Sequence, residues 1–111
     1  MWHAGAMIEE RPDLRYEIEP GDGTVLVRVA GELDLATVDT LNAALAALPP
    51  GDVVLDLTGL AFADSTGLRA LVIEQERLAG TGDRLVVVHA KAAVRRTLEI
   101  SGLDQVLEVR E

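Results

Sequence analysis

The chain has 111 residues, a formal net charge of -9 and no cysteine, and these features exclude several classes of protein. At this length we expect one domain with a single core of helices and strands. The absence of cysteine excludes disulfide frameworks, thiolate metal sites and cysteine nucleophiles. The acidic charge opposes attraction to nucleic acid and to anionic lipid, so neither direct nucleic-acid binding nor membrane association is expected.

The apolar composition predicts an aliphatic core. Hydrophobic residues make up 49% of the chain, yet Trp2, Tyr16 and Phe62 are its only aromatic residues. Val, Leu, Ile and Ala must therefore fill the interior, which suits helices packed on a Val-rich sheet. No apolar run approaches the roughly 20 residues that span a bilayer, and residues 1–7 lack the features of a secretory signal. We therefore predict a cytoplasmic location.

The first third of the chain predicts an extension followed by a hairpin. Residues 1–13 show no clear period, and we expect them to form a flexible N-terminal extension before a single domain at residues 14–111. Apolar and polar residues alternate through 14–19 and again through 24–30. The Pro-Gly-Asp-Gly turn between these segments predicts that the two strands pair antiparallel.

The remaining segments alternate between helical and strand patterns. Thr37 is placed to cap a helix that the Pro-Pro-Gly sequence at 49–51 ends. Residues 53–57 have the apolar run of a buried strand, and a loop over 58–67 leads into a helix at 66–79. The expected elements after it are a strand at 84–89, a helix at 92–101 and a closing strand at 106–109. The strand, helix, strand order predicts that 53–57 and 85–89 are parallel neighbours.

Asp64 and Ser65 form the most informative pair in the sequence. Both are favoured N-cap residues, and the structural interpretation is that they only satisfy the free amides of the following helix. The Ser65 hydroxyl has a second property, because a phosphate placed on it would meet helix N–H donors and the positive end of the helix dipole. It would also add about -1.5 to -2 charge beside Asp64, which would repel a partner fitted to the neutral loop.

A longer motif surrounds this pair. Residues 54–60 (Val-Leu-Asp-Leu-Thr-Gly-Leu), Phe62 and residues 64–68 (Asp-Ser-Thr-Gly-Leu) resemble the signature of the STAS family, the sulfate transporter and anti-sigma factor antagonist domains. The similarity continues at 31–34 (Gly-Glu-Leu-Asp) and at 94–103, so that it covers most of the chain. The resemblance implies an α/β fold, with a mixed β-sheet of four to five strands and helices packed mainly on one face.

The resemblance also implies a function. In anti-sigma factor antagonists similar to this chain, an anti-sigma factor serine kinase phosphorylates the residue after the motif's Asp, which is Ser65 here, with Thr66 as the alternative acceptor. The unmodified antagonist binds the kinase and releases the sigma factor, whereas the phosphorylated form is inactive until a phosphoserine phosphatase restores it. No catalytic residue, metal or cofactor is implied. The residues that the resemblance implies on or beside the partner-facing surface, as partner-binding residues, are Asp34, Asp64, Thr66, Gly67 and Arg69.

Other polar residues are better explained as structural. Lys91, Arg95 and Arg96 have the pattern of a solvated helix face rather than of an anion site. Asp56 has no nucleophile or histidine beside it, so we expect it to hydrogen-bond the nearby loop or to face outward. His89 lacks a partner for metal binding or catalysis, and a capping or surface role is expected.

Two alternative functions remain open. The chain is either a switch, as above, or a permanent STAS subunit of a stressosome-like scaffold or of a lipid or anion transport complex. A nucleotide-binding module or enzyme is the second alternative, which the absence of a phosphate-loop Lys and of paired catalytic groups disfavours. The identity of the bound partner distinguishes the switch from the permanent subunit, and an ATP or GTP titration tests the nucleotide-binding alternative.

Overall fold

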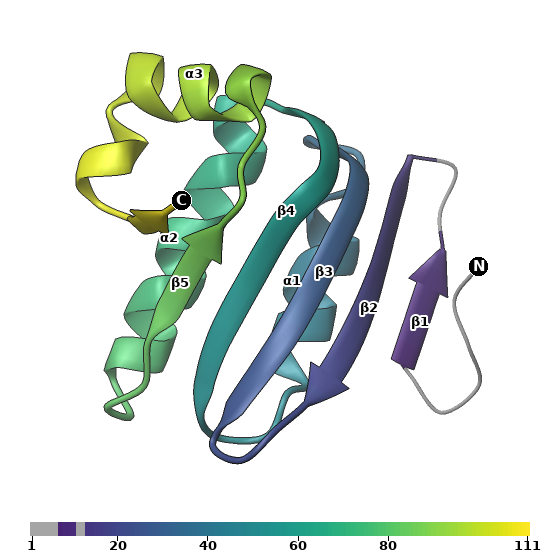
Figure 1. The fold of residues 1–111 in the computed structure, drawn as a ribbon, viewed down its shortest axis with the longest axis vertical. Helices are drawn as coiled ribbons and strands as arrows, with labels where there is room; N and C mark the ends of the chain where they lie inside the picture. The colour runs from purple at the N-terminus through teal and green to yellow at the C-terminus, as the bar shows by residue number, and fades with distance from the viewer. Residues whose placement is uncertain (1–6, 11–12) are drawn as a thin grey trace.

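The computed structural model describes residues 7–10 and 13–111, and in this part of the chain a six-stranded sheet is joined to three α-helices (Figure 1). The elements in chain order are β1 (Met7–Glu10), β2 (Leu14–Pro20), β3 (Thr24–Leu33), α1 (Val38–Ala46), β4 (Asp52–Ala63), α2 (Ser65–Ala79), β5 (Leu85–Val88), α3 (Ala92–Ser101), the 3-10 helix η1 (Leu103–Gln105) and β6 (Glu108–Arg110).

The sheet is mixed, which confirms the predicted fold class. Its strands lie side by side in chain order, with antiparallel pairs from β1 to β3 and parallel pairs from β3 to β6. The predicted parallel neighbours are confirmed, because Val53 pairs with Leu85 and Leu55 pairs with Val87. The helix between them, α2, makes the crossover that parallel strands require.

β1 adds a strand that the sequence pattern did not indicate. Its register places Met7 opposite Ile18 and Glu10 opposite Arg15, so it extends the sheet beyond β2. The strand lies within the segment predicted to be a flexible extension. Residues 1–6 and 11–12 of that segment lie outside the described residues, and the flexibility stays a prediction.

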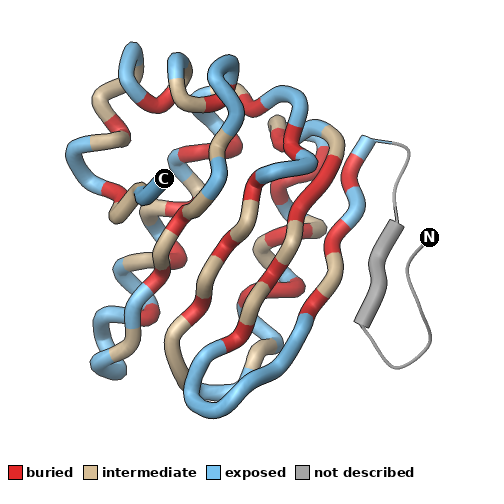
Figure 2. Tube along the Cα trace, viewed as in Figure 1, coloured by how far each residue is buried: buried red, intermediate tan, exposed pale blue. Residues whose placement is uncertain are grey.

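α1 and α2 pack on the same face of the sheet, behind it in the view of Figure 1. Alternate residues of β2 to β5 point toward these helices and are buried, which gives the banded pattern of Figure 2. This alternation follows from the period of two in a strand. The buried row includes Tyr16, Ile18, Val25, Val27, Val53, Leu55, Leu85 and Val87.

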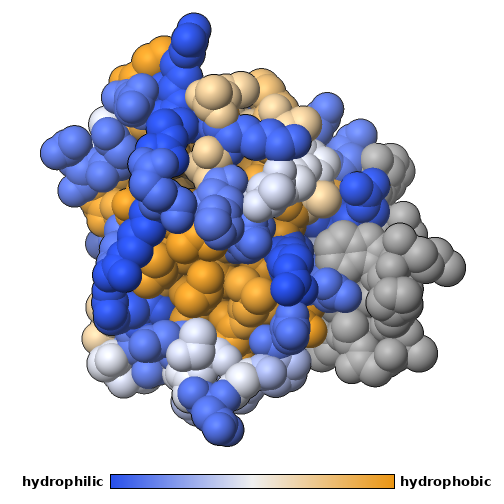
Figure 3. Space-filling model, viewed as in Figure 1, coloured by the Kyte–Doolittle hydropathy of each residue, from blue (hydrophilic) through white to orange (hydrophobic). Residues whose placement is uncertain are grey.

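Among the residues that the structure describes, no helix covers the other face of the sheet (Figure 1). Figure 3 shows an apolar patch at its centre with hydrophilic side chains along both flanks. The register places Leu26, Val54 and Val86 in one row across β3, β4 and β5, and all three are half-buried. On one flank Arg28 pairs with Glu17 at 3.1 Å and with Glu19 at 2.8 Å, while Arg84 and Arg110 bind Glu108 on the other.

β4 is longer than predicted, and the loop expected over 58–67 is wrong. The strand continues to Ala63, and α2 follows after Asp64 alone. Pairing with β3 continues through Leu33 and Ala63, with irregularities in register that accommodate the longer strand. Gly59 permits this close approach, because a Cβ there would lie 2.8 Å from the Cβ of Ala30. The motif therefore stands on two paired strands rather than on a long loop.

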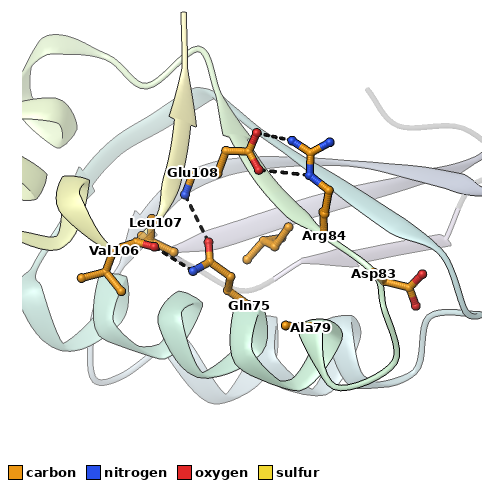
Figure 4. A pocket seen from close by; sticks show the side chains of 8 residues that line it. Gln75, Ala79, Asp83, Arg84, Val106, Leu107 and Glu108 are labelled. Atoms are coloured by element: carbon orange, nitrogen blue, oxygen red, sulfur yellow. Dashed lines mark hydrogen bonds and ion pairs between the residues drawn. The ribbon is translucent and has the colours of Figure 1, made fainter.

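The C-terminal segment crosses the end of the sheet and returns along its edge. α3 ends at Gly102, whose φ of 76° is the left-handed conformation that glycine favours. β6 begins at Glu108, two residues after the predicted start, because Val106 and Leu107 form the turn after η1 and donate their amides to the carbonyl of Leu103. Gln75 of α2 holds this return: its Nε2 donates to the carbonyl of Val106 at 2.8 Å, and its Oε1 accepts from the amide of Glu108 at 3.1 Å (Figure 4).

Candidate functional site

The carboxyl ends of β3 and β4 bring two parts of the motif together. Leu33 and Ala63, the last residues of these parallel strands, are paired in register. Asp34 and Asp64 therefore leave the sheet side by side, and the amide of Asp64 donates to the carbonyl of Leu33 at 3.1 Å. The prediction that both aspartates lie at one edge of the sheet agrees with this geometry.

Asp64 is the N-cap of α2. Its backbone is extended, and its Oδ1 accepts a hydrogen bond of 2.8 Å from the amide of Gly67. The helix thus gains the side-chain acceptor that its first turn lacks. The capping role that the sequence assigned to the pair falls on Asp64 alone.

Ser65 is the first residue of α2 and is exposed. Within the described part of the chain no hydrogen bond engages its hydroxyl, since Asp64 already supplies the cap. Thr66, the next residue, is exposed as well. Exposure alone does not distinguish the two hydroxyls, but Ser65 adjoins the capping carboxylate and lies nearest to the strand ends.

Asp34 closes the neighbouring loop. Its Oδ1 accepts from the amides of Ala36 at 2.9 Å and Thr37 at 3.2 Å. The Thr37 hydroxyl donates to the carbonyl of Glu32 at 2.9 Å and accepts from the amide of Asp34 at 3.1 Å. Thr37 stands at the N-cap position of α1, but its side chain makes no capping hydrogen bond, which corrects the predicted role. Its hydroxyl fixes the loop instead.

Gly67 is buried beneath the site rather than presented on its surface. A Cβ at this position would lie 2.7 Å from the carbonyl oxygen of Leu33 and 2.8 Å from its Cγ. Both distances are shorter than side chains tolerate. Gly67 therefore serves packing, because it allows the first turn of α2 to lie against the end of β3. Gly67 thus lies beneath the surface that its neighbours Ser65 and Thr66 present, and a partner-binding role for it stays a prediction.

Arg69 lies one turn after Ser65 on α2, and both residues line an open hollow of about 520 Å³. Arg69 is exposed, and among the described residues it forms no ion pair. The other residues that line the hollow are Phe62, Ala63, Asp64, Thr97, Ile100 and Ser101. The hollow thus joins the start of α2 to the end of α3.

Three large apolar side chains near the motif are exposed, and the sequence reasoning did not assign them a role. Leu35 follows Asp34 and is 74% exposed, Phe62 of β4 is 48% exposed, and Ile100 of α3 is 80% exposed. Phe62 belongs to the family motif, and an aromatic residue in a polar segment of that motif could have indicated an exposed contact residue. Nothing in the helical pattern around Ile100 placed it near Ser65, because that proximity depends on how α3 crosses the sheet.

The other candidates have structural roles, as expected. Asp56 Oδ1 accepts from the amide of Thr58 at 2.9 Å and from its hydroxyl at 2.7 Å. Arg95 pairs with Glu111 at 3.1 Å. His89 is exposed at the end of β5 with a φ of 60°. The described residues contain no group of three or more potential metal ligands, and none of their helices is long and apolar enough to cross a membrane.

Comparison with known proteins agrees with this arrangement. The family described as "Mlab, STAS domain" matches residues 18–109. The chain belongs to the STAS domain family. An anti-sigma F factor antagonist from Paenibacillus polymyxa is 30% identical over 101 residues, which cover 87% of this chain and 86% of that relative.

Solved structures of STAS domains have the same fold. A crystal structure of an anti-sigma factor antagonist from Mycobacterium paratuberculosis is 32% identical with a TM-score of 0.73, covering 91% of this chain and 89% of that one. The anti-sigma factor antagonist SpoIIAA in its unphosphorylated form is 25% identical with a TM-score of 0.68, covering 86% and 88% of the two chains. The predicted family, a STAS domain of the anti-sigma factor antagonist type, is confirmed.

Proposed function

We propose that this protein is a non-enzymatic partner switch, an anti-sigma factor antagonist controlled at Ser65. The unphosphorylated protein binds an anti-sigma factor serine kinase and thereby releases a sigma factor. Phosphorylation of Ser65 blocks that binding, and a phosphoserine phosphatase restores it. The observation that carries the proposal is an exposed, unengaged Ser65 hydroxyl beside a carboxylate cap, in a STAS chain whose relatives include anti-sigma factor antagonists.

The geometry supports a switch that acts locally. A phosphate on Ser65 would stand in the first turn of α2, where the helix dipole favours negative charge. The cap and the paired strand ends do not depend on the Ser65 hydroxyl, so its modification leaves the fold in place. A partner that must desolvate the same surface would meet a group of about -2 charge beside Asp64.

The surface around Ser65 also suits a protein partner. Leu35 and Phe62 are large, exposed apolar side chains: Leu35 lies in the turn after Asp34, and Phe62 lies near the end of β4, just before Asp64. Exposed apolar side chains surrounded by polar groups are typical of docking surfaces. Asp34, Asp64, Thr66 and the neighbouring Arg69 supply the polar groups in this proposal.

The acceptor is tested by mass spectrometry after incubation with the cognate kinase. We expect phosphate on Ser65, and we expect Ser65→Ala to abolish the modification while Thr66→Ala retains it. Ser65 precedes Thr66 at the start of α2 and is the residue directly after the capping Asp64. Phosphate found mainly on Thr66 would move the site to that residue.

The switch is tested by measuring affinity for the same kinase in calorimetry. Ser65→Ala should bind as the wild type does and resist inactivation, whereas Ser65→Asp should bind more weakly with its fold retained. Loss of a charged contact at a buried docking surface commonly costs about 2 to 5 kcal/mol, a thirtyfold or greater loss. Phosphoserine carries more charge than aspartate, so its effect should be larger. Equal affinities for the wild type, Ser65→Asp and the phosphorylated protein would contradict the switch and favour a permanent subunit of a scaffold or transport complex.

A further inference from the structure

We propose that the hollow between α2 and α3 is the anchor site of the partner, and that it receives an apolar side chain followed by a carboxylate. The inference rests on the proposed function and adds α3 to the docking surface. In this proposal Ile100 and Phe62 form the apolar walls of the hollow, and Arg69 is the cation that binds the carboxylate.

The lining of the hollow determines this chemistry. At about 520 Å³ the space accommodates one or two side chains. Phe62, Ala63 and Ile100 make much of it apolar, and the exposed parts of Phe62 and Ile100 would be covered by an inserted apolar group. The Thr97 hydroxyl donates to the carbonyl of Ala93, so it is not free to donate to an occupant.

The charged side chains that line the hollow favour a carboxylate next to the partner's apolar group. Arg69 is the cation that lines the hollow, and in the described part of the chain no carboxylate pairs with it. The other charged residue of the lining, Asp64, has its Oδ1 engaged by the amide of Gly67. A carboxylate of the partner therefore finds an available guanidinium, which binds carboxylates with good geometry.

The same arrangement connects docking to modification. Ser65 and Arg69 are four residues apart on one helix, the spacing at which side chains are neighbours. A phosphate on Ser65 would compete with the partner's carboxylate for Arg69, and its negative charge would repel that carboxylate. Phosphorylation would thus occupy the Arg69 guanidinium and also add negative charge beside the anchor site.

The test compares matched surface variants in their affinity for the purified anti-sigma serine kinase that binds the wild-type protein. Ile100→Ser and Arg69→Gln should each weaken binding by roughly tenfold or more. The controls are Ile73→Ser, which is 63% exposed on α2 outside the hollow, and Arg15→Gln on β2, and both should bind within about twofold of wild type. All four positions are exposed, and circular dichroism verifies that each variant is folded.

A second arm tests the link to phosphorylation. The loss of affinity on phosphorylating Ser65 should be smaller in Arg69→Gln than in wild type, because the guanidinium for which phosphate competes is already absent. Ile100→Ser and Arg69→Gln that bind as tightly as wild type, while Ser65→Asp does not, would overturn the anchor site and leave the proposed function intact. A wild-type protein that binds no such kinase would overturn both.

Discussion

The connections that follow β3 and β4 use the same capping device with different results, although the second connection is Asp64 alone. In each loop an aspartate turns its Oδ1 back to accept backbone amides, from Ala36 and Thr37 at Asp34 and from Gly67 at Asp64. The first loop is then closed further by the Thr37 hydroxyl. The second connection instead leads directly to Ser65, whose hydroxyl forms no hydrogen bond with the residues that the structure describes.

This difference explains how a modification can change binding without changing shape. The loop at Asp34 is held in one conformation, because the Asp34 carboxylate and the Thr37 hydroxyl both form hydrogen bonds within it. At Asp64 the base is equally fixed, and among the described residues no hydrogen bond engages the hydroxyl of Ser65 or of Thr66. A group added to the Ser65 hydroxyl alters charge at the surface, while the hydrogen bonds made by Asp34 and Asp64 remain.

The largest effect on stability is expected where the first turn of α2 packs against the end of β3. Gly67→Ala would place a Cβ 2.7 Å from the backbone oxygen of Leu33, and that oxygen also accepts from the amide of Asp64. Overpacking of this kind costs about 1 to 3 kcal/mol, even though alanine is the better helix former. Urea denaturation should therefore show a lower free energy of unfolding.

Gly80→Ala is the matched control for this substitution. Its Cβ would meet the carbonyl oxygen of Arg77 at 3.3 Å, and its φ of -63° suits any residue. We expect its free energy of unfolding to lie within about 0.5 kcal/mol of wild type. If Gly67→Ala were equally neutral, the contact between α2 and the end of β3 would not be the constraint that the distances indicate.

The next largest effect is expected at Asp64, where two substitutions distinguish its role as the cap of α2 from the role of its negative charge in partner binding. Asp64→Ala removes the cap and should lower the free energy of unfolding by about 0.5 to 2 kcal/mol. Asp64→Asn keeps an acceptor for the Gly67 amide, so its stability should stay close to wild type while its charge is lost. The measurements are urea denaturation and calorimetry against the kinase.

The aspartate of the other loop completes this comparison. Asp34→Ala loses acceptors for the amides of Ala36 and Thr37 and should be destabilised to a similar degree. If both alanine variants bind the kinase as wild type does, with their folds intact, the docking surface lies elsewhere. If Asp64→Asn binds normally and Asp64→Ala does not, the carboxylate acts through the shape of the loop.

Sequence reasoning predicted those parts of the fold that depend on local pattern. Alternation gave β2 and β3, the short apolar runs gave the parallel pair β4 and β5, and Asp64 marked the start of α2. The continuation of β4 to Ala63 was missed because it has no alternation of its own and depends on irregular pairing with β3. Glycine at 59, which reads as a strand breaker, is there the residue that permits close approach.

The candidate site was predictable in its motif and not in its surroundings. Ser65, Asp64 and Asp34 come from contiguous signatures, and parallel strands bring such ends to one edge. Ile100 reaches the same surface only because α3 packs across the end of the sheet. The burial of Gly67 likewise depends on a contact with Leu33 that no local pattern contains.

The smallest effect is expected far from both loops, at the ion pairs of β6. The pKa of Glu108 lies below its ordinary value of 4.5, and the hydrogen bond from Arg84 is the largest cause. Desolvation raises this pKa in part, and the hydrogen bond from Arg110 lowers it further. A depressed folded-state pKa gives stability that is present above the ordinary pKa and is lost as the pH falls through the folded value. Glu108→Gln should therefore lower the thermal midpoint slightly near neutral pH, and the difference from wild type should vanish in strong acid.

The comparison is made by thermal unfolding near neutral pH and in strong acid, with Glu111→Gln as the control. Glu111 also pairs with an arginine, but its side chain is 92% exposed, and such pairs contribute little to stability. Its substitution should therefore leave the midpoint unchanged at both pH values. A Glu108→Gln difference that grew on acidification would have the wrong sign for a depressed pKa. A neutral-pH difference as large as that of Gly67→Ala would mean that the β6 edge constrains the fold as strongly as the two loops do.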